Sequence, residues 1–222
     1  MQNKWIDDID NKENRWVYKP LFPEKFSGAV IYYSPYIVKL KHFLSEKECG
    51  WLIEQAKDKY TRSTMWIDGK LAHDPRRTSQ SAILTDNGCI KRPYNALLSN
   101  IIRRVCILTG CVPGQVEGLM VIKYEVGEEY QEHWDYFEEE DVGALNQRIA
   151  TFFVYLNDME PEDGGATVFP RLGLKCIPDR GSALFWWNKY GDQLLEDTKH
   201  CGAPVLKGTK YGLNVWIRYP GW

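Results

Sequence analysis

The sequence predicts an α+β protein in which two helices pack against the outside of a β-sheet. Two segments with the apolar spacing of helices come first, at residues 45–60 and 90–109, and segments rich in β-branched and aromatic residues follow them. Helices grouped before a run of strands, and not alternating with them, are typical of this fold class. No repeat with a period of about 20 to 50 residues is visible, which argues against a solenoid.

The chain is expected to form one domain over residues 29–222, preceded by an arm at residues 1–28. The arm is polar, charged and interrupted by proline, and no later stretch looks like a linker. With 44% hydrophobic residues, a chain of this length can build a sizeable core. The first strands are predicted at residues 30–33 and 36–38, separated by Pro35.

The first helix is predicted to begin at a capping box. Ser45 and Glu48 stand three residues apart, so the hydroxyl and the carboxylate can each accept a backbone N–H at the start of the helix. This helix is expected to run to about Tyr60 and to bury Cys49, Leu52, Ile53 and Ala56. The second helix is predicted to end at Gly110. Its apolar positions are Leu97, Leu98, Ile101, Ile102, Val105 and Leu108.

Residues 61–85 are predicted to form two strands around a polar loop at 68–75, which contains glycine and proline. This loop is either a mobile lid over residues 66–76 or a plain hairpin connection, and both interpretations stay open. The strands that follow are predicted at residues 117–124, 148–156, 166–170, 183–187 and 210–218.

The composition excludes several classes of partner. The formal net charge is −2, so no excess of positive charge points to nucleic acid or to anionic lipid. No early apolar run after Met1 indicates a signal peptide, and the longest apolar stretches are too short to cross a bilayer. We therefore expect a cytoplasmic protein that binds neither nucleic acid nor membranes. A monomer is compatible with the sequence, which leaves the oligomeric state open.

The six cysteines are expected to stay mostly reduced. No Cys-x-x-Cys pair and no secretory signal supports a disulfide framework, and no two cysteines have the spacing of zinc ligands. Cys106 and Cys111 are close in sequence and are interpreted as buried thiols near a helix end.

The strongest chemical signal is the sequence His133-Trp134-Asp135. In an extended strand, residues two apart point to the same side, so the His133 imidazole and the Asp135 carboxylate can meet one metal ion. A third ligand must come from elsewhere, and His200 lies between two predicted strands. Two histidines and one carboxylate on one face form a non-haem Fe(II) site with open positions. The alternative is a solvated loop, since four acidic residues follow at 138–141.

The last predicted strand carries a lysine on a face that also holds small and aromatic residues. By alternation this face consists of Lys210, Gly212, Asn214 and Trp216. A buried lysine is costly without an anion, and no partner carboxylate is evident nearby in the sequence. A small-molecule carboxylate is therefore the natural ligand, with Tyr124 and Thr167 as hydroxyl donors. The alternative is a solvated lysine at a strand end.

Together these residues resemble the catalytic domain of collagen-type prolyl 4-hydroxylases, which are Fe(II)- and 2-oxoglutarate-dependent dioxygenases. The resemblance is dense over residues 118–222 and looser over about 36–84. Its motifs are Tyr124-x5-Tyr130-x2-His133-x-Asp135, the run Gly164-Gly165-Ala166-Thr167-Val168-Phe169-Pro170, the single residues His200, Lys210 and Trp216, and Arg77-Thr78-Ser79. It implies a double-stranded β-helix, a jelly-roll core with helices packed on the outside.

The resemblance also implies roles for these residues. The residues that match the iron ligands are His133, Asp135 and His200. Those that match the 2-oxoglutarate site are Lys210, which pairs with the far carboxylate, Tyr124 and Thr167. Those that match the groove for a proline-containing peptide are Arg77, Ser79, Tyr130, Arg148 and Trp216. Oxygen-sensing prolyl hydroxylases carry arginine in place of Lys210, so lysine favours the collagen-like and lysyl-like branches.

The implied reaction is hydroxylation of proline in Pro-rich or collagen-like peptides, coupled to oxidative decarboxylation of 2-oxoglutarate to succinate and CO2. Fe(II), 2-oxoglutarate, dioxygen and ascorbate are the expected cofactors and co-substrates. Two alternatives stay open: a hydroxylase of another protein target, such as lysine, and a jelly roll without catalysis that only binds Pro-rich peptides. A zinc hydrolase is disfavoured because no general base stands out beside the metal residues.

The chain departs from the family pattern in two places. Cys201 directly follows His200, where the family often has Cys-Pro a few residues later, so the disulfide of secreted relatives is not expected here. The chain also lacks the peptide-binding and dimerisation regions of the animal collagen enzymes. We therefore expect a stand-alone catalytic domain, like the short plant, algal, microbial or viral relatives.

Overall fold

The computed structural model describes residues 27–67, 69–85, 95–137 and 147–219, so nearly all of the predicted arm lies outside it. Its helices and strands, in chain order, are β1 (Ser27–Tyr33), β2 (Tyr36–Lys41), α1 (Glu46–Ala56), β3 (Thr61–Arg62), β4 (Met65–Ile67), β5 (Lys70–Ala72), β6 (Gln80–Ile83), α2 (Ala96–Thr109), β7 (Met120–Tyr124), β8 (Tyr130–His133), β9 (Arg148–Tyr155), β10 (Thr167–Phe169), β11 (Leu174–Cys176), β12 (Ala183–Trp187), β13 (Lys189–Tyr190), β14 (Gln193–Leu194), β15 (His200–Gly202) and β16 (Lys210–Arg218).

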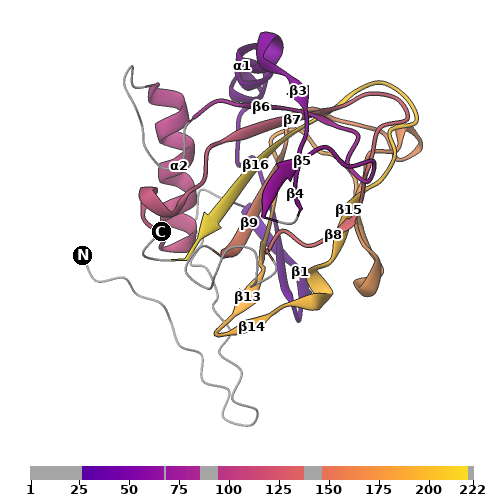
Figure 1. The fold of residues 1–222 in the computed structure, drawn as a ribbon. Coiled ribbons are helices and arrows are strands. Elements are labelled where there is room, and N and C mark those ends of the chain that lie inside the picture. Colours follow the sequence, from indigo (N-terminus) through magenta and orange to yellow (C-terminus); the bar gives the residue numbers. More distant parts are fainter. Residues whose placement is uncertain (1–26, 68, 86–94, 138–146, 220–222) are drawn as a thin grey trace.

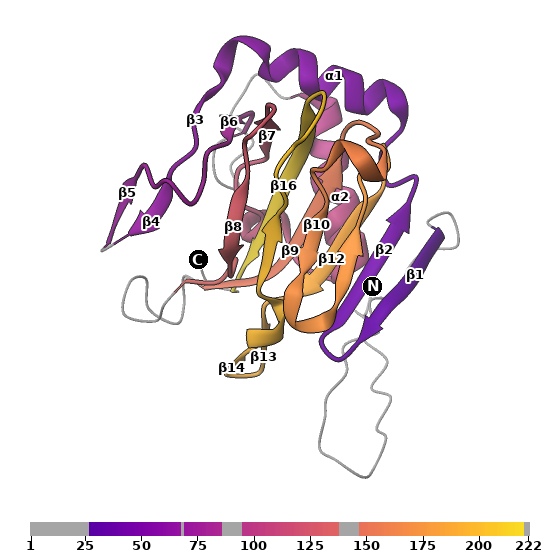
Figure 2. The same ribbon diagram turned by 90° about the vertical axis from the view of Figure 1, so that its right-hand side faces the viewer.

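The fold consists of three layers. An eight-stranded antiparallel sheet has the order β1-β2-β12-β9-β16-β7-β6-β3, and a four-stranded sheet with the order β11-β10-β15-β8 lies over one face of it. Figure 2 looks onto the four-stranded sheet, with α2 behind the larger sheet, and Figure 1 shows both helices on the side away from the smaller sheet. The predicted jelly-roll core with external helices is therefore confirmed.

Strand β9 shows why the central strands of the large sheet consist almost entirely of apolar residues. Phe152 and Val154 point toward the helices and pack in the core that contains Ile101 of α2. Phe153 and Tyr155 point the other way, into a second core between the two sheets. Because both faces of the large sheet are covered, its central strands do not alternate between apolar and polar residues.

The predicted start of α1 and the predicted end of α2 are confirmed, whereas α1 ends earlier than expected. Ser45 and Glu48 form the expected capping box, but α1 ends at Ala56 and is followed by a short 3-10 turn. Helix α2 begins after Asn95, whose side chain accepts two backbone N–H groups, and ends at Gly110 in the left-handed conformation. The predicted residues 90–94 lie outside the described part of the chain. Ile53 and Leu97, expected to be buried, are half-buried.

Residues 61–85 form four short strands, where the sequence predicted two around a loop. Strands β4 and β5 pair with each other, with β5 inside the predicted loop, and β3 and β6 join the edge of the large sheet. The edge of the Trp66 ring faces Phe137, with 6.3 Å between the ring centroids. The hairpin therefore reaches the segment that follows β8, beside the candidate site.

The helices are short, and the described cysteines are free thiols. In the described ranges, α2 is the longest helix at 14 residues, and neither helix has the length and apolar character needed to cross a membrane. Five of the six cysteines are described and carry free thiols, and Cys89 is outside those ranges. The Sγ atoms of Cys106 and Cys111 are 3.6 Å apart, and both residues are half-buried instead of fully buried.

Candidate active site

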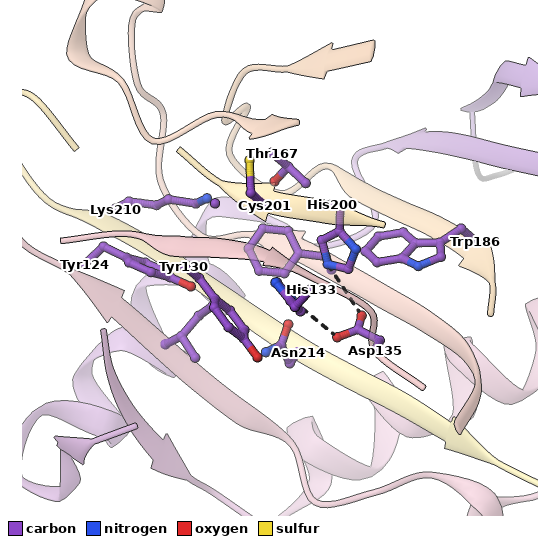
Figure 3. Close-up of a pocket in the computed structure, with 13 residues that line it drawn as sticks. Tyr124, Tyr130, His133, Asp135, Thr167, Trp186, His200, Cys201, Lys210 and Asn214 are labelled. Carbon is purple, nitrogen blue, oxygen red and sulfur yellow. Dashed lines mark ion pairs between the residues drawn. The ribbon is translucent and has the colours of Figure 1, made fainter. Parts of the chain in front are cut away.

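Two strands of the smaller sheet bring the predicted metal ligands together. His133 ends β8 and lies directly opposite His200, the first residue of β15. Asp135 follows in the bend after β8, and one of its oxygens lies 3.8 Å from Nε2 of His133 while the other lies 3.7 Å from Nε2 of His200. Ligand atoms of all three residues lie within 4.8 Å of one another, and Figure 3 shows the side chains converging.

Backbone carbonyls orient both imidazoles for metal binding. His133 Nδ1 donates to the carbonyl of Gln131 at 2.8 Å, and His200 Nδ1 donates to the carbonyl of Thr198 at 2.9 Å. A carbonyl oxygen can only accept, so Nδ1 carries the proton and each Nε2 offers its lone pair to the cavity. Burial, reinforced by His200, holds the pKa of His133 well below its ordinary value, which keeps this ring in the neutral form that ligates metals.

This donor set fits a ferrous ion. Two neutral imidazole nitrogens and one carboxylate, all reached from one side, form the facial arrangement that leaves the remaining positions free for other ligands. Among the residues that the structure describes, no other group of three or more His, Cys, Asp or Glu side chains is arranged to hold a metal. The alternative of a solvated loop does not describe these residues, because Asp135 and His200 are buried.

The same cavity holds a buried cation without a counter-ion. Lys210 begins β16, is 2% exposed, and forms no ion pair with any described carboxylate. Its Nζ instead lies among aromatic rings, 5.3 Å from Tyr124, 5.2 Å from Phe153 and 5.9 Å from Tyr155. Burial lowers the pKa of Lys210 to about 7. An anionic ligand would supply the missing charge partner and restore the protonated form.

Hydroxyl groups and a glycine surround the Lys210 ammonium. Tyr124 lies opposite Lys210 across the β7–β16 pair, and Tyr155 donates to Thr167 Oγ1 at 2.8 Å. A Cβ atom added to Gly202 would lie 3.7 Å from the Tyr124 hydroxyl and 3.8 Å from Lys210 Nζ. Gly202 therefore keeps free the space that a carboxylate bound to both groups needs. The sequence analysis missed this glycine because it lies in the smaller sheet, and only the packing of the two sheets brings it to the lysine.

Trp216 and Arg148 form one wall next to the metal residues. The Arg148 guanidinium lies flat on the indole, 3.6 Å from the ring centroid, and also contacts the ring of Phe137 at 4.5 Å. Trp216 lies opposite Thr151 in β9, so its position is fixed by the centre of the large sheet. The predicted groove residues Arg148 and Trp216 are therefore adjacent, although they are far apart in sequence.

Glu117 holds this wall in place, and the sequence analysis gave it no role. Its two oxygens accept from Arg148 Nε at 2.6 Å and Nη2 at 2.9 Å, and Arg218 forms a further ion pair with it. The carboxylate is buried, at 8% exposure of the residue. An acidic residue at the start of a strand looks solvated in a sequence, and no local pattern indicates partners 31 residues or more away.

Tyr130 lies between the metal residues and two other predicted groove residues. Its ring stacks on His133 with 3.5 Å between centroids, and the Arg77 guanidinium covers it at 4.8 Å. Arg77 also donates to the carbonyl of Thr64, and Ser79 donates to Ser63. Arg77 and Ser79 are both buried, and Arg77 Nε donates to the Ser79 hydroxyl at 3.5 Å. Contact of either residue with a peptide stays a prediction.

The tryptophans near the metal residues differ in surroundings. Trp134 is half-buried; its Nε1 donates to the carbonyl of Glu196 and Lys199 lies over its ring at 4.5 Å. Trp186 is a core residue, and its ring also lies 4.8 Å from the His200 ring and lines the cavity. Trp187, next to it in the chain, is half-buried.

Comparison of the sequence with protein families and with curated proteins gives consistent matches. The profile described as "2OG-Fe(II) oxygenase superfamily" matches residues 119–218. Probable prolyl 4-hydroxylase 10 of Arabidopsis thaliana is 31% identical over 231 residues, covering 94% of this chain and 74% of the plant protein. Prolyl 4-hydroxylase subunit alpha-1 of Gallus gallus is 33% identical over 198 residues, covering 84% of this chain and 36% of that subunit.

A solved structure resembles most of this chain. The viral collagen prolyl hydroxylase of Paramecium Bursaria Chlorella virus-1, in its 2OG complex, aligns with a TM-score of 0.66 and 28% identity. The alignment covers 82% of this chain and 96% of the viral chain. Similarity over 94% of this chain and 74% of the plant relative, the superfamily profile and the shared double-stranded β-helix lead to one assignment. The chain belongs to the prolyl 4-hydroxylase family of 2OG-Fe(II) oxygenases.

Proposed function

We propose that this protein hydroxylates proline in Pro-rich, collagen-like peptides and couples this to conversion of 2-oxoglutarate into succinate and CO2, with the catalytic unit in residues 29–222. One observation carries the proposal. A facial set of two histidines and an aspartate shares a cavity with a buried lysine that has no described counter-ion. A metal site and an anion anchor in one cavity match what a keto-acid-dependent oxygenase requires.

Different residues of the cavity would bind the metal and the keto acid. His133, Asp135 and His200 would hold Fe(II), and Lys210 and Tyr124 would bind the far carboxylate of 2-oxoglutarate, with Thr167 beside them. When bound, iron with 2-oxoglutarate and dioxygen supplies the oxidising power that replaces a C–H bond by C–OH, and ascorbate would keep the iron reduced. The protein contributes position: the stacked Tyr130 and His133 rings and the packed Trp186 ring exclude water from the metal side chains.

A Pro-rich peptide suits the wall beside the metal. Such a peptide is already extended as polyproline II, so little ordering entropy opposes its docking on aromatic surfaces. The Tyr130 ring stacks on His133. Arg148, held by Glu117, lies between the Trp216 ring and the backbone carbonyl of Asp135, to which it donates at 3.5 Å. Collagen-like substrates are suggested by the viral collagen prolyl hydroxylase that this chain resembles.

Binding of 2-oxoglutarate is expected to weaken as the pH rises above about 7. The anion needs the protonated form of Lys210, whose pKa is lowered to about 7 by burial. Above that pH, binding must take up a proton, so the Kd for 2-oxoglutarate should rise toward about tenfold per pH unit. The histidine ligand His133 is already neutral and does not add to this trend. Titration calorimetry on the metal-loaded protein between pH 6 and 9 measures the dependence.

Lys210→Arg is the matched control for this pH dependence. Arginine stays charged throughout the range, so the variant should show a flatter profile whatever its absolute affinity. A flat profile for the wild-type protein would contradict the assignment of Lys210 as a titrating anion anchor.

Removal of the Trp216 ring is expected to harm peptide use selectively. Trp216→Ala should raise the KM for a proline peptide about tenfold or more, because a buried aromatic anchor is lost. Uncoupled turnover of 2-oxoglutarate without peptide should change less than about twofold, since Lys210 and the metal residues stay in place. Trp216→Phe keeps a ring and should be intermediate. Equal losses in both assays would mean that the indole only stabilises the fold.

A substrate panel separates the proposal from its two rivals. The protein is incubated with Fe(II), 2-oxoglutarate and ascorbate, together with a (Pro-Pro-Gly)-type peptide, a lysine-containing peptide or no peptide. The proposal predicts succinate formation stimulated by the proline peptide and hydroxylation of that peptide. Hydroxylation of lysine alone would favour the lysyl alternative. Peptide binding without succinate under any condition would favour a binding module.

A further inference from the structure

A buried chain of side-chain hydrogen bonds leads from the large sheet to the aspartate of the metal site. Thr151 in β9 donates from its hydroxyl to Asp135 Oδ2 at 2.8 Å. Asn188, directly after β12, donates from its side-chain amide to Thr151 Oγ1 at 3.0 Å. Thr151 and Asn188 are both fully buried. Neither residue takes part in the functions assigned above.

The direction of these hydrogen bonds is fixed by chemistry. A hydroxyl has a single proton, and an amide N–H group can only donate. Because the Asn188 amide donates to Thr151, the one proton of Thr151 is left for the Asp135 carboxylate. Asn188 therefore directs the hydroxyl proton of Thr151 toward Asp135. Thr151 in turn forms a hydrogen bond with only one of the two carboxylate oxygens, Oδ2.

Both donors are held by rigid backbone. Thr151 lies in the central strand β9, opposite Trp186 of β12 and Trp216 of β16. The backbone N–H of Asn188 donates to Ile149, and its carbonyl accepts from Leu195. The two side chains are therefore fixed by the sheet, independently of the bend that contains Asp135.

Distance alone does not decide which carboxylate oxygen meets the metal. Oδ1 of Asp135 lies 3.8 Å from Nε2 of His133, and Oδ2 lies 3.7 Å from Nε2 of His200. Only Oδ2 accepts the hydroxyl of Thr151. A carboxylate that bound through both oxygens would use up a position that the keto acid or dioxygen needs.

We propose that Thr151 and Asn188 are positioning residues that hold Asp135 as a one-oxygen ligand: the hydroxyl occupies Oδ2 and leaves Oδ1 for the metal. The inference rests on the proposed iron site. It adds to that site a second layer of two neutral side chains that controls how many positions the aspartate takes. Partners of this kind commonly change metal affinity by about 10- to 100-fold when they are removed.

Metal binding by the full-length protein tests the proposal without any turnover. Co(II) is titrated into the metal-free protein to obtain its Kd, and the visible spectrum of bound Co(II) reports its coordination. Thr151→Val, which removes the hydroxyl at similar volume, should weaken Co(II) binding about 10- to 100-fold and alter the spectrum. Thr151→Ser, which keeps the donor, should behave like the wild type.

A second substitution tests the direction of the chain. In Asn188→Asp the new carboxylate accepts the proton of Thr151, so Asp135 loses its donor although Thr151 is still present. This variant should therefore show the same spectral change as Thr151→Val. Thr109→Val is the matched control, because it removes a buried hydroxyl that donates to the carbonyl of Val105 in α2, away from the cavity. Its Co(II) affinity should equal that of the wild type.

The double variant Thr151→Val with Asn188→Leu keeps the test valid if a single variant folds poorly, since it leaves no amide without a partner at Thr151. Circular dichroism and melting of the metal-free proteins establish folding, and the rise in Tm with Co(II) gives a second measure of affinity. Wild-type Co(II) affinity and spectrum in the folded variants, or equal losses for Thr151→Val and Thr151→Ser, would overturn the positioning role alone. A wild-type protein that binds no metal would overturn the iron site itself.

Discussion

Alanine in place of His133, Asp135 or His200 is expected to abolish iron-dependent succinate formation, with losses of about a thousandfold or more. Each residue would supply one of three protein donors to a single ion, and these donors come from the paired strands β8 and β15 and from the bend after β8. Loss of one donor leaves too few ligands to hold a labile ferrous ion at ordinary concentrations.

Iron content after reconstitution and the rate of succinate formation are the two measurements for these variants. His42→Ala is a suitable control because that imidazole is exposed and lies outside the cavity. It should retain both iron and activity. Full activity in any one of the three alanine variants would show that the metal is held elsewhere.

Lys210→Ala is expected to raise the KM for 2-oxoglutarate about a hundredfold. The charge-assisted bond between a buried ammonium and the far carboxylate is among the stronger interactions available, and the described residues offer no substitute cation in the cavity. Metal affinity should stay within about twofold, because Lys210 makes no contact with the ligand side chains.

A second variant separates loss of charge from loss of volume. Lys210→Met fills nearly the same space without a charge and should resemble Lys210→Ala in its KM for 2-oxoglutarate. Steady-state assays with saturating peptide, varied 2-oxoglutarate and a parallel metal titration give both quantities. An unchanged dependence on 2-oxoglutarate in Lys210→Met would place the anion elsewhere.

Much of the fold could be predicted because residues close in the sequence determine the helix ends and the faces of the strands. The capping box at Ser45 and the left-handed Gly110 fixed one end of each helix. The alternation in β16 placed Lys210 and Trp216 on one face, and the structure shows both facing the inter-sheet side. The ligand types and spacing at His133 and Asp135 indicated a candidate metal site, and the resemblance to a known family added His200, which the structure places opposite His133.

The features that the sequence did not predict depend on contacts between segments that are distant in the chain. Glu117 meets Arg148, and Thr151 meets both Asp135 and Asn188, across separations that no local pattern encodes. Strand β5 lies in a segment predicted as a loop, because a strand of three residues gives too short a pattern to recognise. In each case a polar or short element acquires its role only when the sheets bring its partner to it.

Incorporation of labelled dioxygen into peptidyl proline tests the central claim most directly. The wild-type protein is incubated with Fe(II), 2-oxoglutarate, ascorbate and a (Pro-Pro-Gly)-type peptide under ¹⁸O₂, and the peptide and succinate are analysed by mass spectrometry. The account predicts one ¹⁸O atom on a proline ring for each succinate formed. An iron-loaded protein that forms succinate without labelling proline, or forms none at all, would contradict it.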